Sequence, residues 1–139
     1  MTPPTAQAVR PLACMLPQLA VVAVPGRGRG VIALHPIARG ERIERAPVIE
    51  LTPHERAALG TTRLARYYFE WGPDSSHAAI VLGYGSLYNH SFEPNAEYGF
   101  HEQELAIDYI ALRDIASGEE ITINYNNTGE DAHEPIHFD

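Results

Sequence analysis

The sequence has very little cysteine, and this scarcity narrows the chemistry open to it. Cys14 is the single cysteine among 139 residues. One thiol cannot form an internal disulfide, so a disulfide-stabilised scaffold is excluded. A zinc cluster built on several cysteines is excluded for the same reason. We therefore expect one domain that depends on an ordinary hydrophobic core, which a chain of this length can bury.

Basic residues are also scarce relative to acidic ones. Ten Lys and Arg residues face 18 Asp and Glu residues, and the formal net charge is −8. An acidic chain is poorly suited to a phosphate backbone, so we expect no direct binding of nucleic acid. The charge favours a cationic partner. Four acids gather in one stretch, either as a solvated face or as the wall of a groove for a basic peptide: Glu93, Glu97, Glu102 and Glu104.

Long hydrophobic runs are missing as well. The apolar stretch 12–24 is interrupted by Pro17 and Gln18 and is too short to cross a bilayer. No basic start followed by an unbroken apolar run precedes a small-residue site, so we expect no signal peptide and no membrane association. Residues 1–17 are interpreted as a loose lead-in.

Short β-rich segments separated by turns account for most of the chain. We expect strands at 19–24, 31–34, 41–51, 77–82, 96–100, 105–112 and 120–125. Pro47 indicates that its strand lies at a sheet edge. Thr52-Pro53-His54-Glu55 predicts a helix start with a capping box, and the helix should continue to about residue 64 or 66. The predicted fold class is mostly β with minor α.

One short sequence pattern occurs twice. The segment 37–43 (Ile-Ala-Arg-Gly-Glu-Arg-Ile) matches 115–121 (Ile-Ala-Ser-Gly-Glu-Glu-Ile) at five of seven positions. Each copy is a glycine turn that leads into a strand. The pair is too short for a solenoid repeat and predicts two similar corners within one β-rich fold.

Two glycine-containing segments carry residues that could serve chemistry, although each has a plain structural interpretation. Gly26–Gly30 would let a ligand approach the backbone closely, or would simply form a hairpin turn. It is not a dinucleotide fingerprint, because no helix follows it. Tyr125 ends the segment 118–125, where a buried aromatic ring with a bonded hydroxyl is the alternative to an active-site role.

The densest polar segment is Asn89-His90-Ser91-Phe92-Glu93-Pro94-Asn95. Its single histidine has no second ligand at metal-binding spacing, so we expect no metal site. A hydrolase would need a base beside Ser91. His90 is adjacent, but adjacent side chains of an extended chain point apart, which disfavours this alternative.

Together and in this order, these segments resemble the SET domain, the fold of S-adenosylmethionine-dependent protein lysine methyltransferases. Gly28-Arg29-Gly30-Val31 matches the family's G-x-G-V start, 89–95 matches N-H-S-x-x-P-N, and 118–125 matches G-E-E-L-T-x-x-Y. The resemblance implies a SET domain over residues 18–126. It implies a β-clip fold of short strands and small sheets, with a C-terminal pseudoknot that brings the last two motifs together.

The resemblance implies a site for S-adenosylmethionine, with S-adenosylhomocysteine as the product and no metal. Gly28-Arg29-Gly30 would offer backbone groups to the methionine end of the cofactor. Asn89 would bind the cofactor through its side chain, and His90 would do so through its backbone at the adenine. Tyr125 would be the active-site tyrosine near the sulfonium.

The resemblance also implies a channel for the acceptor lysine. Tyr98 lies nine residues after Asn89, where relatives often place a channel tyrosine, and with Tyr125 it completes the expected catalytic pair. Further channel residues are expected to be Tyr68, Ser86 and Leu87. Since free lysine has a pKa of about 10.4, a narrow apolar channel would help by favouring the neutral amine.

Two departures from the family pattern leave alternatives open. Relatives often carry Arg-Phe where this chain has Ser86-Leu87, and no cysteine-rich segment follows Tyr125. In relatives that lack the cysteine-rich segment, a C-terminal aromatic residue closes the cofactor site. Phe138 in the tail 127–139 is the candidate for this role here. A catalytically silent SET-fold binding or scaffolding module is the alternative to an enzyme. A homodimer is a further expectation, with exposed residues of 67–71 as the candidate surface.

The expected partner is a basic, lysine-containing protein or peptide, and histones are the family's best-known substrate class. Without targeting signals, we expect an intracellular protein. It would be cytoplasmic by default, and nuclear or chromatin-associated if the source is eukaryotic or viral.

Overall fold

The computed structural model of the chain describes residues 18–126. The lead-in 1–17, the tail 127–139 and the candidate Phe138 lie outside the described residues. Within them the strands are β1 (Leu19–Val24), β2 (Gly28–Ala33), β3 (Arg42–Leu51), β4 (Phe69–Trp71), β5 (His77–Val81), β6 (Asn89–His90), β7 (Ala96–His101), β8 (Ala106–Ala111) and β9 (Thr122–Ile123). One α-helix, α1 (Pro53–Ala58), accompanies them in this part of the chain. The predicted class, mostly β with minor α, is confirmed.

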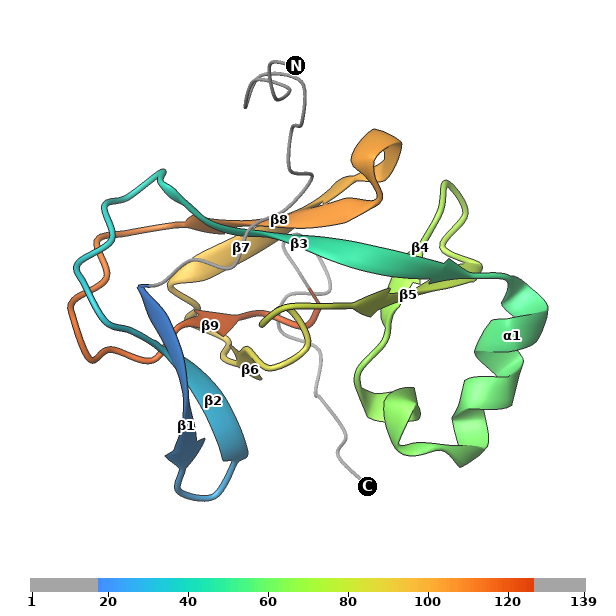
Figure 1. The fold of residues 1–139 in the computed structure, drawn as a ribbon, viewed down its shortest axis with the longest axis horizontal. Helices are drawn as coiled ribbons and strands as arrows, with labels where there is room; N and C mark the ends of the chain where they lie inside the picture. Colours follow the sequence, from blue (N-terminus) through green and yellow to red (C-terminus); the bar gives the residue numbers. More distant parts are fainter. Residues whose placement is uncertain (1–17, 127–139) are drawn as a thin grey trace, which may run out of the picture.

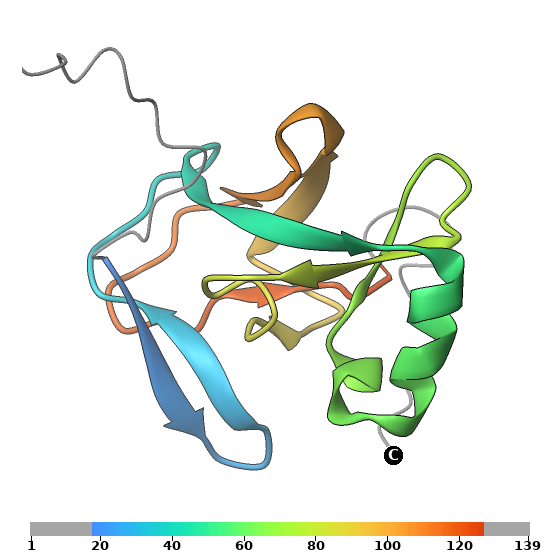
Figure 2. The ribbon, with the colours of Figure 1, turned by 45° about the vertical axis from the view of Figure 1, so that its right-hand side comes forward.

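The described strands form three small sheets. β1 and β2 make an antiparallel hairpin, and five strands form an antiparallel sheet in the order β4-β5-β3-β8-β7. β6 and β9 pair in parallel. In Figures 1 and 2 this parallel pair lies near the middle of the molecule, with the β1–β2 hairpin to one side and α1 to the other.

The edge position expected from Pro47 is wrong, because β3 lies at the centre of the five-stranded sheet. Residues 42–47 pair with β8, and the pairing with β5 begins at Val48. Pro47 therefore lies where β3 changes partner, a position at which one missing N–H is tolerated. Its carbonyl accepts a hydrogen bond from Leu82 N at 2.9 Å.

The helix begins as predicted and ends earlier than predicted. Thr52 Oγ1 accepts from Glu55 N at 3.2 Å and Glu55 Oε1 accepts from Thr52 N at 2.9 Å, which confirms the capping box. After Ala58 the chain continues in 3₁₀ turns at 59–61 and 63–66, separated by an extended Thr62. Gly60 and the neighbouring threonines favour helix weakly. No helix among residues 18–126 is long and apolar enough to cross a membrane.

The two copies of the repeated pattern form similar corners, as predicted, and the corners are joined to each other. Ile37 N donates to Ile115 O at 2.9 Å, and Ile115 N donates to Ile37 O at 2.8 Å. Gly40 (φ +82°) and Gly118 (φ +84°) adopt the same left-handed conformation, which explains why both copies need glycine.

The core lies between the large sheet, the paired corners and the parallel strands. Its most deeply buried apolar members include Val31, Ile37, Ile43, Ile107, Tyr109, Ile115, Ile121 and Ile123. Ile121 and Ile123 flank Thr122, so the final segment is anchored by hydrophobic burial. No residue of α1 is buried. The core therefore holds the last segment firmly and leaves the helix to be fixed by polar contacts.

Candidate functional site

The parallel pair β6–β9 brings the last two sequence motifs side by side. Asn89 pairs with Thr122, His90 pairs with Ile123, and Ser91 N donates to Ile123 O at 2.8 Å. The expected meeting of these motifs is confirmed.

A buried asparagine fixes this crossing from a second direction. Asn95 is 2% exposed, donates from Nδ2 to Glu120 O at 2.8 Å and accepts at Oδ1 from Thr122 N at 2.9 Å. The side-chain amide of Asn95 therefore bonds these two backbone groups in the way that a neighbouring strand would. This role explains why the motif ends in asparagine.

His90 is held as a neutral ring by the backbone of Tyr125. Its Nδ1 accepts from Tyr125 N at 3.0 Å, so the ring proton resides on Nε2. Burial, followed by the charge of Arg27, lowers the pKa of His90. Ser91 Oγ accepts from Glu93 N at 3.0 Å. Nδ1 of His90 is thus occupied by a backbone donor and is not paired with Ser91, which removes the geometry that a hydrolase requires.

An aromatic pocket of ≈ 510 Å³ lies beside this crossing. One wall comes from residues around β4, and the facing wall comes from the turn before β6, from β7 and from the end of the described chain. The lining residues are Arg66, Tyr67, Tyr68, Phe69, Glu70, Ser75, Gly85, Ser86, Tyr88, Tyr98, Phe100, Tyr125 and Asn126.

Two tyrosine hydroxyls in the pocket point their protons at backbone carbonyls. Tyr125 Oη donates to Tyr88 O at 2.9 Å, and Tyr98 Oη donates to Tyr125 O at 3.2 Å. Burial, with a contribution from Glu70, raises the pKa of Tyr98 to about 12, and burial also raises the pKa of Tyr125. Both are therefore neutral phenols at pH 7, whose oxygens can serve a ligand as acceptors.

The structure gathers most of the expected channel residues in this pocket. Tyr98, Tyr125, Tyr68 and Ser86 all line it. Ser86 Oγ donates to Val81 O at 2.9 Å, so its hydroxyl serves the turn. Leu87 is not among the lining residues and packs against the core.

Sequence reasoning missed several lining residues of the same aromatic kind. Tyr67 and Phe69 flank Tyr68, so the aromatic run was their signal. Phe100 follows Tyr98 by two positions on β7, and alternation along a strand places both side chains on one face.

A second cluster lies where β2 meets the parallel pair, and we call Arg29, Gly30, Asn89 and Glu120 the glycine cradle. Asn89 Nδ2 donates to Arg29 O at 2.9 Å and to Glu120 Oε2 at 2.7 Å. A Cβ at Gly30 would lie against Glu120 Oε2 and 2.8 Å from Asn89 Nδ2. Only glycine therefore lets Asn89 close onto β2. Gly28 (φ +74°) completes the turn before it.

Arg27, in the β1–β2 turn, reaches the backbone of His90 and was missed by the sequence reasoning. Its Nη1 donates to His90 O. The backbone of His90 is where the resemblance implies an adenine contact. The glycine cradle and the aromatic pocket adjoin: His90 directly follows Asn89 of the cradle and its ring centre lies 5.1 Å from that of Tyr125, while burial and, to a smaller extent, the charge of Glu120 in the cradle raise the pKa of Tyr125.

A buried carboxylate lies beneath the pocket. Glu44 is 2% exposed, accepts from Tyr88 Oη at 2.7 Å through Oε1 and accepts from Tyr84 N at 3.0 Å through Oε2. Burial raises the pKa of Glu44, and the two donors oppose that rise. Glu44 thus fixes both ends of the turn 84–88, of which Gly85, Ser86 and Tyr88 line the pocket. Residues 18–126 hold no group of three or more His, Cys, Asp or Glu side chains placed to bind a metal.

Comparison with known proteins agrees with this geometry. The model of the SET domain family matches residues 28–126, and the chain belongs to that family. The matched range contains the glycine cradle, the parallel pair and the aromatic pocket.

Curated relatives and solved structures share the similarity. A Schizosaccharomyces pombe histone-lysine N-methyltransferase specific for H3 lysine 37 is 34% identical over 102 residues, which is 73% of this chain and 68% of that protein. The mouse protein-lysine N-trimethyltransferase SMYD5 is 32% identical over 111 residues, 76% of this chain and 25% of that protein. The chain thus spans about a quarter of the mouse relative.

Two solved structures share the fold. A candidate histone methyltransferase of Plasmodium falciparum aligns with a TM-score of 0.63 and 28% identity, covering 78% of this chain and 92% of that one. The Neurospora SET domain protein DIM-5, a histone lysine methyltransferase, aligns with a TM-score of 0.62 and 23% identity, covering 86% and 56%. The expected SET-domain fold is confirmed.

Proposed function

We propose that the protein transfers a methyl group from S-adenosylmethionine to the side-chain amine of a lysine in another protein, with histones as the first substrate class to test. The relatives' names support lysine methylation. The observation that carries the proposal is the aromatic pocket, in which the Tyr98 and Tyr125 hydroxyls act as acceptors directly beside the glycine cradle.

The pocket suits an amine that must be neutral to react. Its walls are largely aromatic, and burial lowers a lysine pKa from about 10.4 by disfavouring the ammonium form. The Tyr98 and Tyr125 oxygens can accept N–H bonds from the amine and so orient its lone pair.

The glycine cradle fits the amino-acid end of the cofactor, which when bound supplies a methyl group on a positively charged sulfur. Asn89 Nδ2 is committed to Arg29 and Glu120, so the amide oxygen is the atom that Asn89 would present to the cofactor's ammonium group. The carboxylate of Glu120 lies beside it and favours the same charge. Closure of this site by Phe138, and a homodimer, stay predictions.

The acceptor lysine must lie outside these 139 residues. All ten basic residues of the chain are arginine, and it contains no lysine. Its net charge of −8 favours association with a basic protein. The absence of lysine also makes an assay unambiguous, because methyllysine can then arise only on the added substrate.

Mass spectrometry of histones and lysine-rich peptides incubated with the protein and S-adenosylmethionine tests the proposal. We expect mass gains of one or more methyl groups on lysine. Tyr125→Phe should lower the rate by about 10²-fold or more, since it removes an acceptor at the reacting amine. Tyr84→Phe is the matched control, because its hydroxyl lies outside the pocket.

The silent-module alternative makes a different prediction. Cofactor binding in a titration, with no methyl transfer to any substrate, would support a binding or scaffolding role. Absence of cofactor binding would contradict the proposal altogether.

A further inference from the structure

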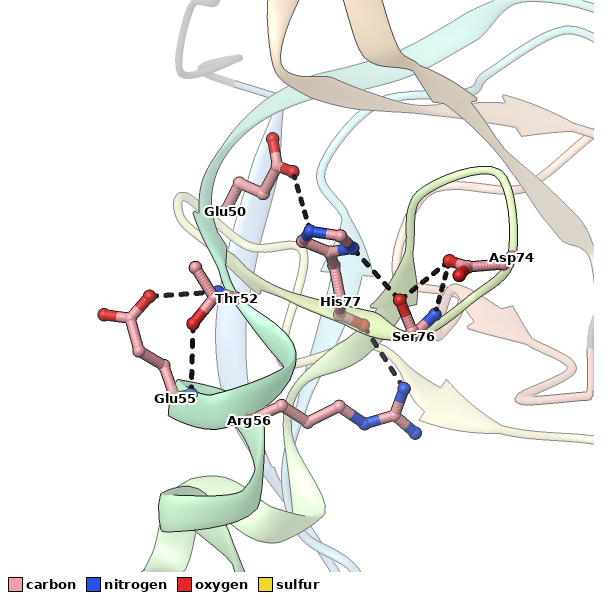
Figure 3. A network of polar contacts seen from close by, with 7 residues as sticks. All are labelled: Glu50, Thr52, Glu55, Arg56, Asp74, Ser76 and His77. Carbon is pink, nitrogen blue, oxygen red and sulfur yellow. Dashed lines mark hydrogen bonds and ion pairs between the residues drawn. The ribbon is translucent and has the colours of Figure 1, made fainter.

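Arg56 extends from α1 to the chain segment that forms one wall of the aromatic pocket. Figure 3 shows its guanidinium directed at the backbone of His77, while Thr52 and Glu55 cap the start of the same helix. The side chain is half-buried, although no residue of α1 belongs to the core. Arg56 is therefore a principal tie between the helix and the strands β4 and β5.

The contacts of Arg56 fall mainly on residues that line the pocket. Nη1 donates to Ser75 O at 2.6 Å and to His77 O at 3.3 Å. Nε donates to Tyr68 Oη at 3.3 Å, and the guanidinium lies 5.2 Å from the centre of that ring. Nη2 donates to Glu70 Oε1 at 3.3 Å. Tyr68, Glu70 and Ser75 are all lining residues, so one side chain secures three positions of the wall.

The loop carrying Ser75 has a conformation that needs such support. Ser75 has φ +58°, in the left-handed region, and Gly72 has φ +92°. A serine persists in this region only when its surroundings hold it there. Ser75 N donates to Gly72 O at 3.1 Å, and Ser76 bonds to Asp74 through both N and Oγ (Figure 3). Arg56 holds the Ser75 carbonyl from the helix side.

The glycine cradle makes no hydrogen bond with Arg56 among the described residues, and the tyrosine hydroxyls of the facing wall have partners of their own. Tyr98 and Tyr125 are fixed by backbone carbonyls, and Asn89 is fixed by Arg29 and Glu120. In Figure 1 the β1–β2 hairpin and α1 lie on opposite sides of the parallel pair. A change at Arg56 therefore reaches the wall around β4 without reaching the cradle.

We propose that Arg56 is the positioning residue for this wall, and that by holding Tyr68, Glu70 and Ser75 it sets the affinity for the acceptor peptide without contributing to cofactor binding. This inference rests on the proposed function. Arginine is required because its planar fork reaches several acceptors at once, whereas lysine offers one point charge.

The test compares Arg56→Ala and Arg56→Lys with Arg63→Ala. Arg63 is an exposed arginine in the nearby turn 63–66 and is not among the lining residues, so its loss removes the same charge from the same region. The measurements are kcat and KM for one histone peptide, the Kd for S-adenosylmethionine by calorimetry, and amide hydrogen exchange of residues 67–77. Arg56→Gln, which keeps part of the stem, replaces Arg56→Ala if that variant does not fold.

We expect Arg56→Ala to raise the peptide KM about tenfold, with a smaller change in kcat and an unchanged cofactor Kd. Exchange at 67–77 should accelerate. Arg56→Lys should recover only part of the KM, and Arg63→Ala should match the wild type. An unchanged KM, an equal rise in Arg63→Ala, or a parallel loss of cofactor binding would each overturn the inference.

Failure of the proposed function would be recognised separately. If the wild-type protein methylates nothing, the exchange data still decide whether Arg56 holds the wall. Faster exchange at 67–77 in Arg56→Ala than in Arg63→Ala keeps the positioning role, and equal exchange refutes it.

Discussion

Removing the Tyr88 hydroxyl should destabilise the protein by a predictable amount. Tyr88 is 1% exposed, and its Oη donates to Glu44 Oε1 at 2.7 Å. In Tyr88→Phe the ring keeps its packing against Tyr109, whose ring centre lies 4.6 Å away. The substitution therefore removes one hydrogen bond to a buried carboxylate and creates almost no cavity.

The expected loss in the free energy of unfolding is about 1.5–3 kcal/mol at neutral pH, the range for hydrogen bonds to charged groups. It belongs in this range because Glu44 is 2% exposed and water cannot replace the missing donor. Tyr84 N, which donates to Glu44 Oε2 at 3.0 Å, would remain bonded to the carboxylate. Tyr84→Phe is the matched control, since Tyr84 contacts Glu44 through its backbone.

The loss should depend on pH in a defined direction. Burial raises the pKa of Glu44 in the folded state above its unfolded value of about 4.3. Between the unfolded and the folded pKa values, the folded state binds more protons than the unfolded state. The free energy of unfolding therefore falls as pH rises through the folded pKa of Glu44. Without Tyr88 Oη the folded pKa should rise further. The difference between wild type and Tyr88→Phe should therefore be largest at neutral pH and shrink toward about 0.5–1.5 kcal/mol as Glu44 takes up a proton.

Urea unfolding at several pH values measures these differences. Equal stability of Tyr88→Phe and wild type at pH 7 would refute the reasoning. A loss of the same size in Tyr84→Phe would refute it as well, because that variant leaves both donors to Glu44 in place.

Three further predictions concern the glycine cradle and the neighbouring His90. Gly30→Ala should weaken cofactor binding and cost about 1–3 kcal/mol of stability, because its Cβ would displace Asn89, whereas Gly99→Ala, where a Cβ meets nothing within 4 Å, should be nearly neutral in binding and unfolding assays. Asn89→Ala should raise the cofactor Kd in calorimetry, and an unchanged value would remove Asn89 from the site. The pKa of His90 is lowered in the folded state, so its unfolded form binds more protons and stability should fall as pH drops below about 6.5. His90→Gln should reduce that slope in urea titrations; an identical slope would contradict the assignment.

Local sequence signals predicted the elements that depend on near neighbours. The Thr52–Glu55 capping box and the two glycine corners each depend on a few adjacent residues, and the structure contains both as predicted. The last strand was predicted over 120–125, but only Thr122 and Ile123 form it. The flanking residues Glu120 and Tyr125 are bonded to the side chains of Asn95 and His90, and no local sequence pattern predicts these contacts.

The same distinction separates the candidate-site residues that the sequence predicted from those that it did not. The ordered motifs indicated Asn89, His90 and Tyr125, because each motif can be recognised in the sequence without knowledge of the fold. Glu44 and Arg27 were missed because their partners lie 44 and 63 positions away. An isolated Glu in a strand, or an Arg in a glycine turn, belongs to no sequence pattern that predicts a hydrogen bond to so distant a residue.

The parallel pairing of β6 with β9 also fixes when the protein becomes competent during synthesis. The strands of the β1–β2 hairpin and of the antiparallel β3–β5 pair have all left the ribosome well before residue 120 is added. The aromatic pocket and the glycine cradle both wait for residues 120–126, which supply Glu120 and Tyr125. A chain cut before residue 120 lacks both Glu120 and Tyr125 and would therefore lose the glycine cradle and the aromatic pocket together.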